Sequence, residues 1–293
     1  MRYCVYGNPT LDIIYENNKP PYTSHGGGSY YSTLPLLVHG VKPEVYAVYS
    51  RVLVDHPVSS YIVKQQYSSR ANIFVLEYRG LHRDLKILEV SENILDWNTH
   101  IGICNAIVNP VIGEISINLV KKIRLSTEIL SIDIQGFIRD HVNTEIRLIY
   151  KPDVLFLFEL ADIIHTDQDE YNALMEISNF AIREKIHKTL RGSLVITSPP
   201  NKAVLITRHK TRYLEFEDNY IAFQRTGAGD YYLGAYTYYY YKSMDEEEAA
   251  YKAHDETSRW LRHRDKGLIA PPSLSHLIPM ASLKTISDII SIG

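Results

Sequence analysis

The pentapeptide Thr226-Gly227-Ala228-Gly229-Asp230 is the most informative stretch of this 293-residue chain, and a tyrosine-rich segment with helical character, Gly229–Lys242, follows it. Small residues let the backbone turn tightly and let a ligand approach the main chain. The N–H groups at a helix start favour anions. The charge of an aspartate there would repel a bound phosphate. That cost is explained if the aspartate takes a proton from a substrate hydroxyl beside the bound phosphoryl group. Taken alone, the pentapeptide fits a plain glycine turn equally well, because Asp is common near helix N-termini.

A second glycine run, His25-Gly26-Gly27-Gly28-Ser29, opens a segment expected to be helical, Ser29–Val38. Gly27 and Gly28 would let a ligand lie against bare backbone. Upstream, Asp12 follows Gly7-Asn8-Pro9-Thr10, where a carboxylate could accept paired hydroxyls of a polyol. On its own this pattern is more typical of a simple strand–turn–helix connection.

The composition excludes several classes of protein. With 31 Lys+Arg against 34 Asp+Glu, the net charge of −3 gives no electrostatic case for nucleic acid or an anionic membrane as partner. A hydrophobic content of 45% with 22% charged residues predicts a folded globular chain. The 23 tyrosines outnumber all other aromatic residues, and we expect many of them at half-buried positions.

The two cysteines, Cys4 and Cys104, lie in separate apolar stretches. We expect two buried thiols in a reducing cytosol, because the spacing supplies neither a disulfide scaffold nor His or Asp ligands for a metal. The histidines likewise form no sequence cluster typical of a metal site. Met1–Tyr6 does not resemble a signal peptide, and the longest apolar run, Val154–Ile164, is too short to span a bilayer. A cytoplasmic protein is expected.

Apolar runs rich in β-branched and aromatic residues alternate with helical periods, which predicts an α/β fold with a largely parallel sheet covered by helices. The expected strands are Tyr3–Tyr6, Val45–Tyr49, Asn72–Tyr78, Ile101–Val108, Ile129–Asp133, Asp162–His165 and Ser193–Thr197, followed by two strands within Val204–Phe216. The expected helices are Ser29–Val38, Glu114–Ile123, one or two within Asp167–His187, and then Gly229–Lys242, Asp245–Arg262 and Ser282–Ile292. Leu11–Tyr15 and Leu81–Val90 are expected to form a small sheet that stands off the main one.

The order and spacing of these motifs resemble the ribokinase-like (PfkB) carbohydrate kinase family. Ile132–Arg139 is similar to the D-x-Q-G-x-x-R stretch of some archaeal-type members. Ala161–Glu170 resembles the family strand ending in N-x-x-E, with Asp167 replacing Asn and Glu170 kept. Leu194–Thr197 is similar to the strand before the nucleotide loop. The resemblance implies a three-layer sandwich, formed by one domain over residues 1–293 with a small β lid at about 11–24 and 81–98.

The resemblance also assigns roles to residues in an ATP-dependent phosphotransferase that acts on a small sugar or polyol. Asp230 is the expected general base, and the turn Gly227-Ala228-Gly229 is the expected anion hole. The implied substrate-binding residues are Asn8, Asp12, Gly27, Gly28, Gln135 and Arg139. The implied nucleotide-binding residues are Thr197, Asn201, Thr226 and Gly229. Asp167 and Glu170 would hold Mg²⁺ through water, and lids of this kind often pair between subunits, so a homodimer is expected.

Two departures from the family pattern keep other functions open. Gln224 stands where the family usually has Asp, and Ser198-Pro199-Pro200-Asn201-Lys202-Ala203 lacks the glycines of the usual nucleotide loop. A non-catalytic sugar- or nucleotide-binding regulatory protein is therefore one alternative. A nucleoside kinase, with Tyr30 or Tyr31 stacked on a base, is another.

Overall fold

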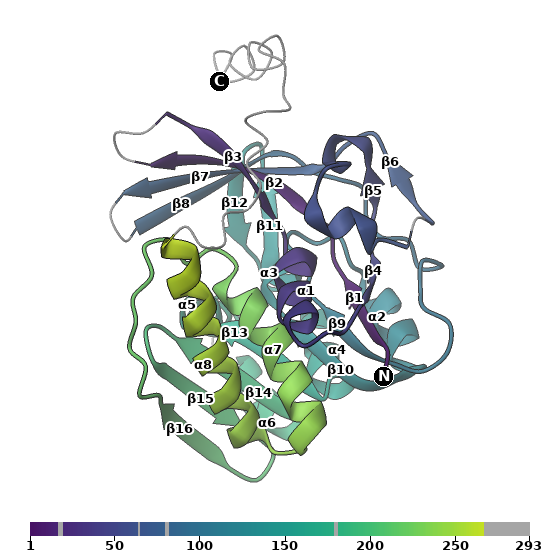
Figure 1. The fold of residues 1–293 in the computed structure, drawn as a ribbon. Coiled ribbons are helices and arrows are strands. Elements are labelled where there is room, and N and C mark those ends of the chain that lie inside the picture. The colour runs from purple at the N-terminus through teal and green to yellow at the C-terminus, as the bar shows by residue number, and fades with distance from the viewer. Residues whose placement is uncertain (17–19, 64, 80–81, 179–180, 267–293) are drawn as a thin grey trace.

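Figure 1 shows the fold in a computed structural model that describes residues 1–16, 20–63, 65–79, 82–178 and 181–266. The strands of the described residues are β1 Tyr3–Tyr6, β2 Thr10–Glu16, β3 Tyr22–Gly26, β4 Glu44–Tyr46, β5 Tyr49–Ser50, β6 Tyr67–Ser68, β7 Asn72–Arg79, β8 His82–Glu89, β9 Cys104–Val108, β10 Thr127–Asp133, β11 Arg139–Val142, β12 Glu145–Leu148, β13 Ile163–Asp167, β14 Ser193–Ser198, β15 Lys202–Ile206 and β16 Thr211–Glu215. The α-helices are α1 Gly28–Val38, α2 Ile117–Arg124, α3 Gln135–Ile138, α4 Leu155–Leu160, α5 Gln168–Ile177, α6 Ala181–Thr189, α7 Ala228–Ser243 and α8 Glu246–Asp265. In these ranges no helix has both the length and the apolar character needed to cross a bilayer.

The main sheet has the strand order β16-β15-β14-β13-β10-β9-β1-β4. Pairing is parallel from β14 to β4 and antiparallel for β15 and β16. The predicted α/β class with a mostly parallel sheet is therefore confirmed.

Both faces of the main sheet are buried at its central strands, such as β1 and β9, which explains why these strands are mostly apolar, whereas the edge strand β16 is largely exposed. In β1, Cys4 and Tyr6 belong to a core with α2, α4, α5 and α6, whereas Tyr3 and Val5 belong to a core with α1, α7 and α8. The structure thus has three layers, with α1, α7 and α8 in front of the sheet in Figure 1. Many tyrosines are half-buried as expected, among them Tyr238, Tyr239 and Tyr240, whereas others such as Tyr6 and Tyr236 are fully buried.

A second sheet, in the order β11-β12-β8-β7-β2-β3, lies across one end of the main sheet (Figure 1). We call it the lid sheet. It is larger than predicted, because β7, expected in the main sheet, pairs here with β2 and β8. The hairpin of β11 and β12 was missed altogether, and residues 90–98, expected in the lid, contain no strand. The assignment of residues 1–293 to one domain stays a prediction, and the expected helix Ser282–Ile292 lies outside the described residues.

Most expected elements are present, with shifted ends. The strand predicted from Ile101 begins at Cys104, because residues 101–103 precede the sheet and Ile101 and Ile103 are exposed. The helix predicted from Glu114 begins at Ile117, with the Ser116 hydroxyl accepting a hydrogen bond from the N–H of Leu119 at 3.0 Å. A side-chain cap of this kind fixes where a helix starts.

Glu114 does not begin the helix but binds backbone N–H groups near the connection between β9 and α2. Its buried carboxylate accepts hydrogen bonds from the backbone N–H groups of Val111, Ile112 and Asn8, at 2.9, 2.8 and 3.2 Å. It thereby joins the loops that follow β1 and β9, which lie side by side in the sheet.

We expect Glu114→Ala to lower the free energy of unfolding by about 3 kcal/mol or more, because three buried N–H groups lose their acceptor and each unsatisfied group costs about 1–3 kcal/mol. Urea unfolding followed by circular dichroism measures the change. Glu176→Ala, at an exposed position of α5, is the control and should change stability by less than about 0.5 kcal/mol. Equal stability of the two variants would contradict this role of Glu114.

Candidate active site

A cleft of about 780 Å³ lies between the carboxyl ends of the main-sheet strands and the lid sheet. Parallel sheets commonly bind ligands at this edge. Of the residues predicted to bind or react, the lining contains Asp12, Gly27, Gly28, Gln135, Arg139, Asp167, Glu170, Thr197, Thr226, Gly227, Ala228, Gly229 and Asp230. The fold therefore brings together residues that are more than 200 positions apart in the chain.

Asp230 lies in the first turn of α7 and is held by two side-chain amides. Its Oδ1 accepts hydrogen bonds from Nδ2 of Asn109 at 2.9 Å and from Nε2 of Gln135 at 2.7 Å. Burial, with the nearby charge of Asp133, raises the pKa of Asp230 to about 6, although the Asn109 hydrogen bond acts in the opposite direction. A carboxylate with a pKa close to neutral is suited to proton transfer.

The turn before α7 depends on Gly227. This residue has a φ of +80°, which favours glycine, and a Cβ at this position would lie 2.4 Å from the ring of Tyr31. The N–H of Ala228 donates to the carbonyl of Arg225 at 3.0 Å, so this amide is engaged within the turn. The N–H groups of Gly229 and Asp230 are first-turn amides without an intrahelical acceptor. They are better placed than Ala228 to bind an anion.

A buried pair of side chains lies behind this helix start. Nδ1 of His165 is 2.7 Å from Oδ2 of Asp133, and Nε2 of His165 is 3.1 Å from the hydroxyl of Thr197. Burial alone would lower the pKa of His165, but the hydrogen bond and the charge of Asp133 raise it. A Cβ on Gly229 would lie 3.0 Å from the imidazole ring, which shows how closely His165 approaches the turn.

At the lid side of the cleft, Asp12 is buried and accepts a hydrogen bond from the hydroxyl of Thr10 at 2.7 Å. Burial raises the pKa of Asp12 to about 6, and the charge of Arg83 partly opposes the shift. Gly28 lies against Asn109, whose Oδ1 would be 2.4 Å from a Cβ at this position. Asp12 and the Gly27–Gly28 turn thus lie in the same part of the cleft, as the sequence predicts.

Two predicted site residues bind each other. Nη2 of Arg139 is 2.8 Å from Oε1 of Glu170, and this ion pair is largely buried. The other carboxylate oxygen of Glu170 accepts from the backbone N–H of Asp167 at 3.4 Å, and Oδ1 of Asp167 accepts from the N–H of Glu170 at 2.7 Å. Together these contacts form a capping box that begins α5. Glu170 is therefore engaged on both oxygens, although it lines the cleft together with Asp167 and Asp169.

The loop before α7 is bound to the lid sheet. The hydroxyl of Thr226, predicted to bind nucleotide, contacts the hydroxyl of Tyr78 and Nη1 of Arg83, the latter at 3.1 Å. Nε2 of Gln224 donates to Glu16 and, at 2.6 Å, to the hydroxyl of Tyr22. Gln224, which departs from the family pattern, thus connects the loop to β2 and β3.

Two predicted site residues lie outside the cleft lining. Asn8 is buried, where its Oδ1 accepts from the N–H of Val48 at 2.9 Å and its Nδ2 donates to the carbonyl of Glu92 at 3.2 Å. Nδ2 of Asn201 donates to the carbonyl of Phe216 at 2.9 Å. In this structure both side chains connect backbone segments.

Three side chains at the centre of the site, Asn109, Asp133 and His165, were not predicted as site residues. Asn109 directly follows β9, Asp133 is the last residue of β10, and His165 lies two residues before the end of β13. A polar residue that ends an apolar strand was the available signal, because the carboxyl ends of parallel strands share one edge of the sheet.

We expect Gly227→Ala to lose about 2–5 kcal/mol of stability, because a non-glycine residue at positive φ is strained and its Cβ would overlap Tyr31. Gly40→Ala is a matched control, since Gly40 has a φ of +72° but no heavy atom within 4 Å of the added Cβ. Urea unfolding of both variants separates backbone strain from the contact with Tyr31. Equal losses of stability in the two variants would show that the Tyr31 ring moves aside without cost and does not constrain the turn.

Comparisons with known proteins show which solved structures share this fold. No protein-family model matches the chain, and no curated protein matches its sequence. Among solved structures, a pyrophosphate-dependent kinase in the ribokinase family, in complex with sulfate, is 20% identical with a TM-score of 0.76, covering 91% of this chain and 100% of that chain. A nucleoside kinase from Methanocaldococcus jannaschii is 15% identical with a TM-score of 0.67, covering 89% of this chain and 92% of that chain.

A ribokinase from Thermotoga maritima is 13% identical with a TM-score of 0.65, again covering 89% of this chain and 92% of that chain. These proteins share the three-layer arrangement of helices around a mostly parallel sheet with this chain over nearly its whole length. The sequence resemblance to ribokinase-like proteins thus agrees with an independent comparison of structures. The chain has the ribokinase-like fold.

Proposed function

We propose that the protein is a kinase that transfers a phosphoryl group to a hydroxyl of a small polyhydroxylated substrate, a sugar or polyol. The observation that carries this proposal is the position of Asp230. Its carboxylate has a pKa near 6, is oriented by two amides, and adjoins the first-turn N–H groups of α7. A base beside an anion-binding helix start is the arrangement that phosphoryl transfer to a hydroxyl requires.

In this mechanism Asp230 takes the proton of the attacking hydroxyl. Asn109 and Gln135 donate to one oxygen of Asp230, so they fix its orientation toward the cleft. The amides of Gly229 and Asp230 bind the transferring phosphoryl group, and the raised pKa of His165 favours a positive charge behind them. Asp12 accepts hydroxyl groups of the substrate at the lid side.

The phosphoryl donor is ATP or inorganic pyrophosphate. The resemblance implies ATP, but the segment at the nucleotide loop, Ser198-Pro199-Pro200-Asn201-Lys202-Ala203, lacks both glycines of the family pattern. One structural neighbour is described as a pyrophosphate-dependent kinase complexed with a pyrophosphate analog and myo-inositol, at 20% identity and a TM-score of 0.75. Both donors therefore belong in one test.

The oxygen donors at the start of α5 fit a hydrated Mg²⁺. Asp167, Asp169 and Glu170 all line the cleft, but both oxygens of Glu170 are engaged, and burial raises the pKa of Glu170 to about 8. When bound, Mg²⁺ neutralises charge on the donor phosphates, and it usually keeps several waters. We therefore assign Mg²⁺ to Asp167 with Asp169, and we assign Glu170 to positioning Arg139 and α5.

A nucleoside kinase is the second candidate. Phe74, Leu76, Leu85 and Val111 give the lid side of the cleft an apolar wall that could pack against a base. A nucleoside kinase from Burkholderia thailandensis, in complex with inosine, is also a neighbour in structure, at 13% identity and a TM-score of 0.67. The non-catalytic binding protein is a third candidate. A homodimer through the lid sheet stays a prediction.

The direct test is a phosphorylation screen with Mg·ATP and with Mg·pyrophosphate, across myo-inositol, ribose, hexoses and nucleosides. We expect a phosphorylated product from one acceptor class. Asp230→Asn should reduce its rate by about 10²–10⁴-fold, the usual contribution of a general base. The variant keeps an oxygen acceptor for Asn109 and Gln135, so it should fold normally.

Asp255→Asn, an exposed position of α8, controls for unspecific loss of charge and should leave the rate unchanged. An unchanged rate in Asp230→Asn would contradict the assigned base. Absence of product with every donor and acceptor would leave the binding protein as the better interpretation.

The pH profile tests the environment of Asp230. Because the base works in its charged form, kcat/KM should fall as the pH drops through about 6 and stay level above it. Asn109→Ala removes a hydrogen bond that stabilises the charged form, so the acid limb should move to higher pH. Asn172→Ala, at an exposed position of α5, should leave it in place. An acid limb that does not move in Asn109→Ala would refute the positioning role of Asn109.

A further inference from the structure

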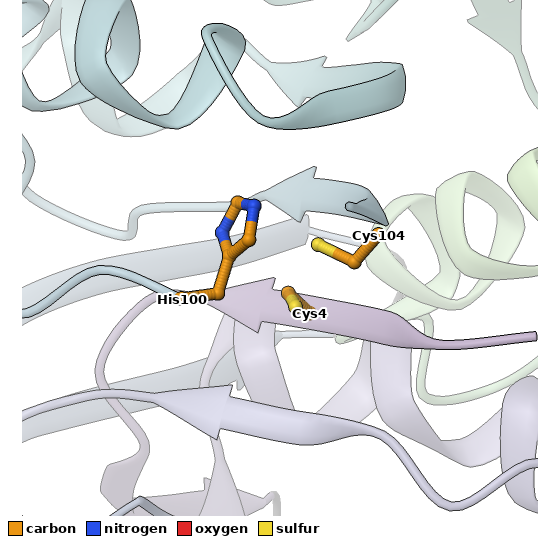
Figure 2. Close-up of side chains that lie close together, drawn as sticks. All are labelled: Cys4, His100 and Cys104. Atoms are coloured by element: carbon orange, nitrogen blue, oxygen red, sulfur yellow. The ribbon is translucent and has the colours of Figure 1, made fainter. Parts of the chain in front are cut away.

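The two cysteines of the chain meet at the amino ends of β1 and β9, together with a histidine. Figure 2 shows the side chains of Cys4, Cys104 and His100 converging, from β1, from the first residue of β9 and from the segment before it. The two sulfurs and a ring nitrogen all lie within 4.8 Å of one another, and all three residues are buried. The prediction of buried thiols is confirmed, but the expectation that they lack a histidine partner is wrong.

The register of the sheet explains this convergence. Cys4 pairs with Ala106 across the parallel strands, so Cys104, two residues earlier, lies on the same face as Cys4. Residues 101–103 then carry the chain back so that His100 lies near the sulfurs. A spacing of 100 residues between the cysteines does not reveal a pairing that depends on strand register.

His100 is held by neighbours in the way that metal-binding histidines are. The Tyr6 hydroxyl lies 2.6 Å from Nδ1, and it also accepts from the backbone N–H of His100 at 2.9 Å. Nε2 faces the carbonyl oxygen and the hydroxyl of Ser126, at 3.0 and 2.9 Å. A hydrogen bond to one ring nitrogen commonly orients the other toward a metal.

The dimensions suit a small metal ion. With Zn–S bonds of about 2.3 Å and Zn–N bonds of about 2.0 Å, tetrahedral zinc ligands lie roughly 3.5–3.8 Å apart. Donor atoms within 4.8 Å of one another reach that spacing through side-chain shifts of about 1 Å. Such shifts require no movement of the strands.

The charge balance of the complex also suits a dication. Two thiolates, a neutral imidazole and a divalent ion have no net charge, which is the least costly state for a buried site.

We propose that Cys4, Cys104 and Nε2 of His100 form a structural site for a thiophilic divalent metal ion, with Zn²⁺ as its natural occupant. Binding replaces the contact between Nε2 and Ser126 by a bond to the metal. The cysteines bind as thiolates, so any thiol proton is released to solvent as the metal binds, and the complex with a neutral imidazole has no net charge. No oxidation takes place.

The site is remote from the cleft. Cys104 begins β9 and Asn109 follows its end, so about five residues of extended chain, roughly 16 Å, separate them. The ion would connect β1, β9 and the segment before β9. We therefore expect it to stabilise the main sheet, independently of the proposed kinase activity.

The test is titration of reduced, chelator-treated full-length protein with Co²⁺, followed by competition with Zn²⁺. We expect one Co²⁺ per chain, thiolate-to-cobalt charge-transfer absorption in the near ultraviolet, and displacement by Zn²⁺. Zn²⁺ should also raise the Tm in proportion to the logarithm of its concentration. None of these readouts depends on catalysis.

Cys104→Ala should abolish the charge-transfer band and weaken Zn²⁺ binding at least about 100-fold, and its Tm should not respond to Zn²⁺. His141→Gln, in the lid sheet, is the control and should bind as the wild type does. If Cys104→Ala does not fold, His100→Gln answers the same question, since it should weaken binding while keeping thiolate absorption.

Two results would overturn the proposal. One is wild-type protein that shows neither the band nor a Zn²⁺-dependent Tm. The other is metal binding that survives in Cys104→Ala. A Cys4–Cys104 disulfide in the purified protein, with no metal binding after its reduction, would likewise refute the metal site.

Discussion

The side-chain amide of Asn109 joins the parts of the cleft. Its Nδ2 lies 3.3 Å from the carbonyl of Gly28, 2.8 Å from the hydroxyl of Ser32 and 2.9 Å from Oδ1 of Asp230. The end of β9 is thereby bound to the starts of both α1 and α7. A Cβ on Gly28 would overlap Asn109, so a glycine is needed at this position for the Asn109 amide to reach Asp230. The two glycine-rich turns are parts of one arrangement, although they are about 200 residues apart.

The lid sheet is coupled to this arrangement through the loop before α7. Thr226 contacts Tyr78 and Arg83 of the lid, and Gln224 contacts Tyr22. From the opposite side, Nη1 of Arg264 donates to the carbonyl of Thr226 at 2.7 Å. The loop that positions the first amides of α7 is therefore held between α8 and the lid. A change in the lid would reach the helix start through these contacts, which connects closure over a substrate with the geometry around Asp230.

Local patterns predicted the fold well, because buried parallel strands are apolar runs and glycine turns before helices are short motifs. Strand β7 was placed in the wrong sheet, since an apolar run does not reveal which partner it pairs with. Site residues within motifs, such as Asp230 and Asp12, line the cleft. Asn109 belongs to no motif, and His165 lies in the matched stretch Ala161–Glu170 without being one of its motif residues. The role of both arises from strand order, which single-sequence periodicity does not encode. The ion pair of Arg139 with Glu170 was missed for the same reason.

A chain with a net charge of −3 can still be expected to bind phosphate, because the acidic residues of the cleft are each paired locally. Each buried acid has its own partner: His165 for Asp133, Arg139 for Glu170, the amides of Asn109 and Gln135 for Asp230, and the hydroxyl of Thr10 for Asp12. Neutralisation is therefore local, so an anion at the start of α7 meets helix amides and the imidazole of His165, whose pKa is raised by its partnership with Asp133, rather than a general negative field. Burial nevertheless raises the pKa of Asp230 and Asp12 to about 6 and that of Glu170 to about 8. The charge of Arg139 opposes the shift of Glu170, and the hydrogen bonds from Asn109 and Thr10 oppose the shifts of Asp230 and Asp12. Burial, more than the kind of partner, therefore sets how readily these carboxylates exchange a proton.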